Sequence, residues 1–452
     1  MDSEPLTITA AAPMIQRGEL TPSDLLEQCL ARIDRYEEKV RAWVYLDRER
    51  ARTEAAQLTD EIKKGHYRGP LHGIPVGIKD IIDVFDMPTG CGSKLWANSY
   101  ARRDATCVQR LREAGALILG KTVTTAFASF DPPVTRNPWN LDRTPGGSSS
   151  GSAAAVACGM CLAALATQTG GSITRPASYC GVCSLKPTYG RVSVDGVLPL
   201  APSLDHVGLM ANCVRDLATV YQVIAGPDAR RGFTFASHVP IRDCLTILDQ
   251  DPLPRPDLYR LGGLFDERIG AEFSGLYETA ADKLLSEMSV SERAVPPAGF
   301  AEVLPAHHVI MGVETAEYHS QRLDRRPDDY PPRIRELIEF GRSTPAVAYR
   351  HARVFRDDLE EQITGMLPGR VFLTPATTGL PPSLETTGDP AFNSPWSFTG
   401  HPTVSVPAGW SHDGLPYSVQ LVGPPGCEDD LLAAAVWCET VIDWDRRRVP
   451  VS

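Results

Sequence analysis

The segment from residue 144 to residue 187 places the strongest constraint on what this chain can fold into. It reads TPGGSSSGSAAAVACGMCLAALATQTGGSITRPASYCGVCSLKP, with a Gly/Ser loop at 146–152, small apolar residues at 153–166 and a second Gly/Ser loop at 170–172. Glycine allows backbone conformations that are closed to other residues and lets a ligand approach the main chain closely. We therefore predict two serine-bearing loops, joined by a short helix and a strand, that form two halves of one site.

A third part of this site is predicted upstream, in the apolar run from residue 73 to residue 82. Its Ile and Val content is typical of a buried strand, and Lys79 lies near its end. Lysine is rarely buried unless it is paired, so taken alone Lys79 would turn to solvent or meet Asp80 or Asp83. Beside two serine loops, a catalytic role becomes the better interpretation.

These three motifs, in this order, resemble the amidase signature family, whose catalytic triad is Ser-Ser-Lys. The resemblance covers about residues 71–208 and returns weakly at 400–409. It implies that Lys79 is the family's lysine, that Ser148 is its bridging serine, reached through a cis peptide, and that Ser172 is its nucleophile.

The chemistry of amide hydrolysis explains these residue types. A lysine is a base only when it is neutral, and burial lowers a lysine pKa by up to ~3–5 units. A hydroxyl donates and accepts together, so Ser148 can relay a proton from Ser172 to Lys79. Converging backbone N–H groups stabilise the oxyanion of such reactions. We expect that oxyanion hole at Thr169, Gly170, Gly171 and Ser172.

Substrate contacts are predicted on both sides of this site. Gly147 and Ser149 flank the bridging serine, and Phe392 and Trp396 lie in an aromatic loop at 392–398 that could line a pocket. Packing in the core explains these two aromatic residues equally well.

The chain departs from the family pattern at one point. The family commonly reads Asp-Thr-Gly-Gly-Ser-Ile-Arg, whereas this chain has Gln168 in place of the acid, and its arginine, Arg175, comes one residue later. The triad positions are intact, so the departure bears on the hydrogen bonds around them and on the choice of substrate.

A different nucleophile is possible within the same loop. Residues 147–151 fit G-x-S-x-G, the nucleophile elbow of α/β-hydrolases, with Ser149 as nucleophile of an esterase. That motif needs a buried strand directly before it, and residues 136–145 are typical of a loop. The best histidine partner is His206, beside Asp205. This interpretation stays as the alternative mechanism.

Three further patterns indicate no cofactor and no metal. Residues 115–122 fit the phosphate-loop consensus, but an apolar strand replaces the exposed loop that the consensus requires. Buried cysteine behaves as a small hydrophobe, which explains four cysteines at zinc-ribbon spacing better than zinc does. A third set matches no metal-ligand pattern: His307, His308, Glu314 and Glu317.

Composition narrows the possible partners and location. The net charge of −11 argues against a nucleic-acid or anionic-membrane partner, and no apolar run is long enough to span a bilayer. Residues 1–5 are acidic and do not indicate a secretory signal. Eleven cysteines, an odd number, fit reduced thiols and a cytoplasmic location.

The expected fold is α/β, with a large mixed β-sheet covered by helices on both faces, as the resemblance implies. Alternating strands and helices through residues 71–225 agree with it. We expect a single amidase-signature domain over residues 1–452, a catalytic core at 65–215 and a variable helical region at 226–364 that covers the site.

The expected function is hydrolysis of a C–N bond next to a carbonyl, without a cofactor, by a monomer or homodimer. The substrate would be a small or aryl amide, an anilide or a carbamate (urethane), since the chain is similar to urethane-cleaving members of the family. Two alternatives stay open: a glutaminase or amidotransferase-like subunit, and a non-catalytic binding module that keeps the fold.

Overall fold

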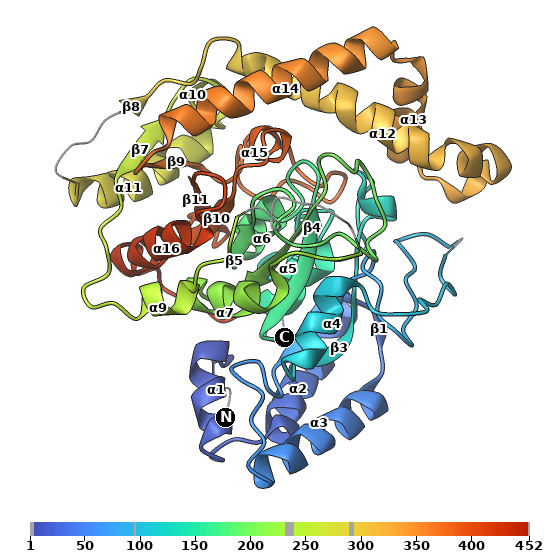
Figure 1. Ribbon diagram of the computed structural model, residues 1–452, viewed down its shortest axis with the longest axis vertical. Helices are drawn as coiled ribbons and strands as arrows, with labels where there is room; N and C mark the ends of the chain where they lie inside the picture. Colours follow the sequence, from blue (N-terminus) through green and yellow to red (C-terminus); the bar gives the residue numbers. More distant parts are fainter. Residues whose placement is uncertain (1–3, 95, 231–238, 289–292, 451–452) are drawn as a thin grey trace.

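The fold is built on one large mixed sheet (Figure 1). The computed structural model describes residues 4–94, 96–230, 239–288 and 293–450. Within these residues the sheet has eleven strands, in the order β1-β3-β2-β4-β6-β5-β10-β11-β9-β7-β8. Parallel and antiparallel pairs both occur, so the predicted α/β class with a large mixed sheet is confirmed.

Two parallel strands fix the position of the predicted site. Strand β2 (Pro75–Lys79) pairs in parallel with β4 (Ala163–Gln168), and every residue of both strands is buried. Burial on both faces explains why these strands are almost continuously apolar in sequence. Because the strands are parallel, their carboxyl ends meet at the same edge of the sheet. Lys79 and the loop that follows Gln168 therefore lie at one edge.

The remaining strands extend this sheet to both sides. Antiparallel pairing brings β6 next to β4 and β5 next to β6, and a parallel pair joins β2 to β3. Their bounds are β1 (Trp43–Leu46), β3 (Leu117–Thr122), β5 (Cys183–Lys186), β6 (His206–Ala211), β7 (Leu258–Leu261), β8 (Arg293–Ala294), β9 (Val371–Pro375), β10 (Thr403–Trp410) and β11 (Pro416–Val422).

Helices cover both faces of the sheet, as predicted. Helices α5 (Ser150–Ala157) and α6 (Thr174–Cys180) pack on each other and on the central strands, while α7 (Val214–Ile224) and α16 (Glu428–Ile442) form a second packed pair. Small residues let α5 lie close to its neighbours. A Cβ added to Gly151 would come within 2.2 Å of a backbone oxygen, so only glycine fits there.

The segment from 226 to 364 is mainly helical where the structure describes it. Its long helices α12 (Val303–Arg325), α13 (Pro332–Ser343) and α14 (Ala346–Met366) lie together at one end of the molecule (Figure 1). Helix α12 packs on both α13 and α14. The variability of this segment among relatives, and the single-domain boundaries, stay predictions.

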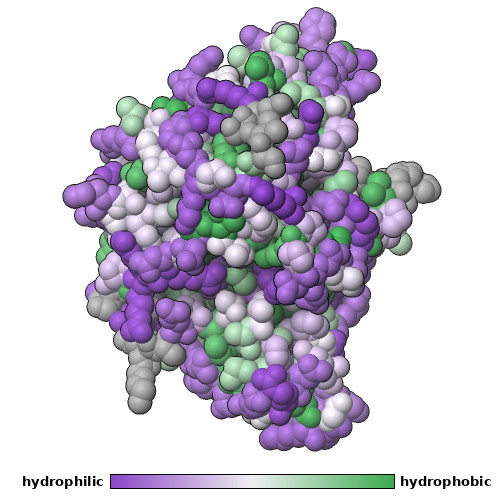
Figure 2. All heavy atoms as spheres, turned by 90° about the vertical axis from the view of Figure 1, so that its left-hand side faces the viewer, coloured by the Kyte–Doolittle hydropathy of each residue, from purple (hydrophilic) through white to green (hydrophobic). Residues whose placement is uncertain are grey.

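The other helices lie around these elements. Those described are α1 (Ile8–Gln16), α2 (Pro22–Val40), α3 (Arg48–Lys63), α4 (Thr106–Glu113), α9 (Cys244–Leu248), α10 (Leu264–Arg268), α11 (Ala271–Ser286) and α15 (Ser394–Phe398). None of the helices in the described residues is both long enough and apolar enough to cross a bilayer. Figure 2 shows one face of the molecule, on which hydrophilic side chains predominate and apolar ones occur in small groups.

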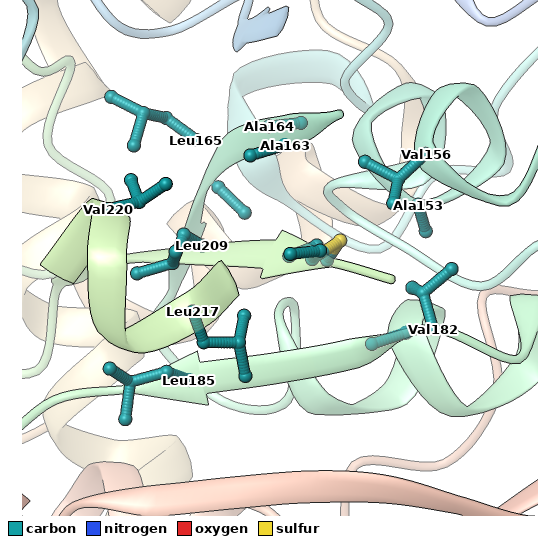
Figure 3. Close-up of a cluster of buried hydrophobic side chains, with 14 of the residues drawn as sticks. Ala153, Val156, Ala163, Ala164, Leu165, Val182, Leu185, Leu209, Leu217 and Val220 are labelled. Carbon is teal, nitrogen blue, oxygen red and sulfur yellow. The ribbon is translucent and has the colours of Figure 1, made fainter. Parts of the chain in front are cut away.

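Apolar side chains of the central strands and of α5 and α7 meet in a buried cluster (Figure 3). Leu165 of β4, Leu209 of β6 and Leu217 of α7 are all fully buried there. This cluster supports the strands from which the site loops emerge.

Truncation in this cluster should destabilise the whole fold. We expect Leu209→Ala to lower the free energy of unfolding by ~2–5 kcal/mol, because it removes buried methyl groups and leaves a cavity. Chemical denaturation would measure the change. Val44→Ala is the matched control, since Val44 is 55% exposed, and its effect should stay within ~0.5 kcal/mol. Equal losses in the two variants would contradict this prediction.

Candidate active site

Lys79 ends β2 inside the protein, where it contacts Ser148. The Lys79 Nζ atom lies 2.7 Å from Ser148 Oγ and 2.7 Å from Thr167 Oγ1, and the side chain is fully buried. Burial holds the pKa of Lys79 well below its usual range, against an opposing attraction from Asp205. A neutral amine within hydrogen-bond distance of a hydroxyl can take its proton.

The carboxylate beside Lys79 in sequence does not pair with it. Asp80 instead forms a buried ion pair with Lys121, at 3.1 Å. The simpler interpretation, in which Asp80 neutralises Lys79, is therefore not what the structure shows.

Ser148 lies in a loop that packs tightly against its surroundings. The Gly147–Ser148 peptide is cis, as the family resemblance implied. Ser148 is buried, and its carbonyl accepts from Thr125 N at 3.2 Å. A Cβ on Gly147 would lie 2.8 Å from Thr387 Cγ2, so the cis peptide is enclosed on this side.

Ser172 follows β4 and precedes α6, in the loop opposite Ser148. It is 8% exposed, whereas Ser148 is 1% and Lys79 0% exposed, so Ser172 is the most accessible of the three side chains. A Cβ on Gly146 would come within 2.8 Å of Pro176 Cα, so the loop that carries Ser148 lies against the start of α6. The fold thus gathers both serine loops and Lys79 in one place.

Three carbonyls of the loop before Ser172, those of residues 169–171, accept hydrogen bonds. Thr169 O accepts from His307 Nε2 at 2.8 Å, Gly170 O from Ser397 Oγ at 2.8 Å, and Gly171 O from the Arg175 N–H at 3.0 Å. In a trans peptide the N–H points opposite to the C=O. The N–H groups of residues 170–172 therefore face away from these partners, and the described residues offer them no acceptor. Such free donors are what an oxyanion hole requires.

Gln168 and Arg175, the two departures from the family pattern, both bind the site loops. Gln168 Oε1 accepts from Ile173 N at 2.9 Å and from Thr174 N at 3.0 Å, and its Nε2 donates to Ser397 Oγ at 3.1 Å. A carboxylate could accept the first two hydrogen bonds but could not donate the third.

Arg175 still reaches the site although it comes one residue late. Its Nη2 donates to Gly147 O at 2.7 Å and to Thr387 Oγ1 at 3.3 Å. Burial lowers the pKa of Arg175 to about 10. The guanidinium therefore ties the Ser148 loop to α6.

Asp205 belongs to the site, although the sequence indicated it only as a neighbour of His206. It is buried and accepts from Thr169 Oγ1 at 2.5 Å and from the N–H groups of Leu200 and Ala201. Burial raises the pKa of Asp205 to about 6. No pattern in the sequence indicates this contact, because Asp205 and Thr169 lie in separate loops and meet only in the fold.

The geometry around Ser149 does not favour the esterase alternative. Its hydroxyl is fully buried and donates to Thr167 O at 3.2 Å. Residues 137–149 form turns and loop rather than the strand that a nucleophile elbow requires. His206 is the histidine that the sequence offers as a partner for Ser149. Its Nδ1 lies 2.7 Å from Leu204 O instead.

Phe392 and Trp396 lie in the core. Both are fully buried, with ring centroids 5.1 Å and 5.9 Å from that of Phe265. This geometry favours the core-packing alternative, and contact of these two residues with a substrate stays a prediction. Gly147 forms the cis peptide with Ser148, and substrate contact by Gly147 and Ser149 likewise stays a prediction.

The remaining motifs take structural positions. Lys121 of the phosphate-loop pattern is buried in β3 and paired with Asp80. In the described part of the chain no group of three or more His, Cys, Asp or Glu side chains could hold a metal ion. Four cysteines match the zinc spacing, and all are buried: Cys158, Cys161, Cys180 and Cys183.

Comparison with known proteins identifies the family. A family model described as Amidase matches residues 24–432. The chain is 33% identical to the putative amidase AmiD of Mycobacterium bovis, in an alignment that covers 99% of this chain and 96% of that relative. It is 34% identical to one of the subunits of the glutamyl-tRNA(Gln) amidotransferase of Chloroflexus aggregans, with 98% of each covered.

A solved structure agrees in fold over almost the whole chain. The peptide amidase from Stenotrophomonas maltophilia matches with a TM-score of 0.86 and 28% identity, and 99% of each chain is covered. The chain belongs to the amidase family, and its fold is that of the amidase-signature enzymes. As a member it is a hydrolase of carbon–nitrogen bonds.

The lowered pKa of Lys79 predicts the pH dependence of activity. A base acts when it is unprotonated, so kcat/KM should rise with pH through the lowered pKa of Lys79 and fall as the pH drops below it. The acidic limb should therefore lie well below the ordinary lysine value of 10.5. A pH–rate profile measures this limb.

Lys79→Arg is the matched variant for this profile, because arginine stays protonated in a protein and so cannot act as the base. It should lose ~10²–10⁴-fold in kcat/KM at every pH. An unchanged acidic limb in this variant would exclude Lys79 as the titrating base.

Proposed function

We propose that this chain hydrolyses a small or aryl amide, an anilide or a carbamate through Ser172, Ser148 and Lys79. One observation carries the proposal. The Lys79 amine is buried, the described residues give it no ion pair, its pKa is lowered, and its Nζ lies 2.7 Å from Ser148 Oγ. Burial of a lysine charge is costly, so a catalytic role accounts for this position better than a structural one.

In the proposed mechanism Lys79 takes the Ser148 proton while Ser148 takes the Ser172 proton. Ser172 Oγ attacks the substrate carbonyl carbon, and the oxyanion is held by the N–H groups of the 169–172 loop. Collapse of this intermediate breaks the C–N bond, and the same relay returns a proton to the leaving nitrogen. Water then attacks the acyl-serine by the same route and releases the acid.

The family and the relatives support the proposed substrate class. The peptide amidase and the putative amidase AmiD support an amide substrate by their names. The urethane-cleaving members that the sequence resembles support a carbamate. We infer a small-molecule substrate because the net charge of −11 does not favour a nucleic-acid partner. A cytoplasmic location is likewise proposed, and eleven free cysteines support it.

A second candidate is a glutaminase that supplies ammonia to a partner protein. The identity of 34% with an amidotransferase component favours it as much as the amidases favour the first candidate. The two differ in what the isolated chain does. Hydrolysis of model amides by the isolated chain, with no glutamine present, would support the first candidate. Activity on glutamine only in the presence of a partner would support the second.

A fluorophosphonate probe followed by mass spectrometry should label Ser172. The probe reacts with a serine only when a base activates it, so Lys79→Ala should lower the labelling rate by ~10²–10⁴-fold. Ser149→Ala is the matched control and should keep the label on Ser172, because Ser149 is buried in a contact with Thr167. Labelling of Ser149 would support the esterase alternative, and a folded protein without any label would support the binding module.

A substrate panel should then distinguish the acyl and leaving groups. We expect turnover of p-nitroanilides or nitrophenyl carbamates by the wild-type chain and none by Ser172→Ala. Ser172 Oγ forms the bond to the acyl group, so its loss should reduce kcat by ~10⁴-fold or more. Release of nitroaniline or nitrophenol, followed by absorbance, measures the turnover. Equal turnover by Ser172→Ala would exclude the proposed nucleophile.

A further inference from the structure

Two carbonyls of the Ser172 loop are held by side chains that the proposed mechanism does not use. His307 Nε2 lies 2.8 Å from Thr169 O, and because a carbonyl only accepts, the imidazole donates. Ser397 Oγ donates to Gly170 O at 2.8 Å. His307 comes from α12 and Ser397 from α15, so two elements far apart in the sequence hold consecutive peptides. We call His307 and Ser397 the carbonyl clamp.

We propose that the carbonyl clamp positions the oxyanion hole by fixing the two peptide planes between Thr169 and Gly171. The inference rests on the proposed function. His307 and Ser397 are positioning residues, because they act through the backbone and not on the substrate. With each carbonyl held on the clamp side, the N–H of Gly170 and the N–H of Gly171 face the opposite side, where a developing oxyanion could accept from them.

Glycine makes the clamp necessary. Gly170 and Gly171 have no Cβ, so their backbones can adopt many conformations, and peptide planes between glycines rotate more freely than others. A rotated plane would present a carbonyl oxygen where an N–H is needed. A side chain on Gly171 cannot restrain the loop instead, because its Cβ would lie 2.6 Å from Asn393 Oδ1.

Gln168 fixes the direction in which Ser397 donates. Its Nε2 donates to Ser397 Oγ at 3.1 Å, so the Ser397 hydroxyl keeps its proton for Gly170 O. The orientation of the Gln168 amide is determined, since its Oε1 accepts from two backbone N–H groups. A carboxylate at this position would accept the Ser397 proton instead, and Gly170 O would lose its donor. The amide at position 168 is therefore matched to the clamp.

His307 is held in the form that the clamp requires. The ring is buried, and burial lowers the pKa of His307 to about 4. It packs near Phe398, and its Cε1 lies 3.6 Å from the position of a Cβ on Gly170. The ring thus contacts the loop directly as a neutral donor.

Variants of His307 that differ in donor position test the clamp. The amide of glutamine reaches about as far as imidazole Nε2, whereas that of asparagine reaches only about as far as Nδ1. We expect His307→Asn to lower kcat and the rate of fluorophosphonate labelling of Ser172 by ~10–100-fold with little change in KM, below the ~10²–10³-fold cost of deleting an oxyanion donor. His307→Gln should recover most of this loss. His308→Gln is the matched control on the neighbouring, exposed residue.

Gln168→Glu and Ser397→Ala test the second arm of the clamp in the same assays. Both should lower kcat rather than raise KM, and the double variant should lose no more than about the larger single loss, because both act on one hydrogen bond. Equal kcat in His307→Asn, His307→Gln and wild type, at equal melting temperatures, would overturn the inference.

Hydrogen exchange tests positioning without any catalysis. In the substrate-free full chain, the peptide covering residues 165–175 should exchange faster in His307→Asn than in His307→Gln or wild type. If the wild-type chain is not labelled by the fluorophosphonate probe and hydrolyses none of the substrates, the proposed function fails. The difference in hydrogen exchange still tests the clamp in that case. Unchanged exchange in this peptide would overturn the clamp in either case.

Discussion

The contact between Lys79 and Ser148 is the interaction on which the rest of the site depends. A fully buried ammonium would be strongly destabilising, and Asp80, the nearest carboxylate in sequence, is already paired with Lys121. The fold therefore favours a neutral amine, and a neutral amine 2.7 Å from a hydroxyl is a base. In the proposed mechanism, this burial is what makes Lys79 the base. Asp205 adds a buried carboxyl whose pKa burial raises to about 6, and its attraction opposes the lowering of the Lys79 pKa.

The parallel direction of β2 and β4 brings the other parts of the site next to this contact. Because β2 and β4 are parallel neighbours, Lys79 and the residue after Gln168 reach the same edge of the sheet, although α4, β3 and α5 lie between the two strands in sequence. Short α5 and α6 then begin beside the two serines, and their small residues let the loops approach closely. Arg175 joins the two halves by donating from α6 to Gly147 O. The sheet supplies the rigid frame, and the glycine loops supply the free N–H groups.

The parts of this site that could be predicted from the sequence are those coded within one continuous stretch. The apolar run ending at Lys79 and the two Gly/Ser loops each carry their own signal, and the fold class follows from the alternation around them. Asp205 and His307 could not be predicted in this way, since their roles depend on which loop or helix lies beside residue 169. Phe392 shows that a local sequence pattern can also fit two different structural positions. An aromatic loop has the same composition whether it lines a pocket or packs in the core, and only the burial of its rings beside Phe265 separates the two.

The hydrogen bonds of Gln168 explain what the replacement of the family's acid changes. A carboxylate and an amide oxygen are equivalent toward the N–H groups of Ile173 and Thr174, so the start of α6 is supported by either. They differ toward Ser397, because only the amide can donate. The substitution therefore leaves the proposed nucleophile in place and changes which group donates to one carbonyl, that of Gly170. In the proposed mechanism, a change of this kind alters the support of the oxyanion hole and leaves Lys79, Ser148 and Ser172 themselves unchanged.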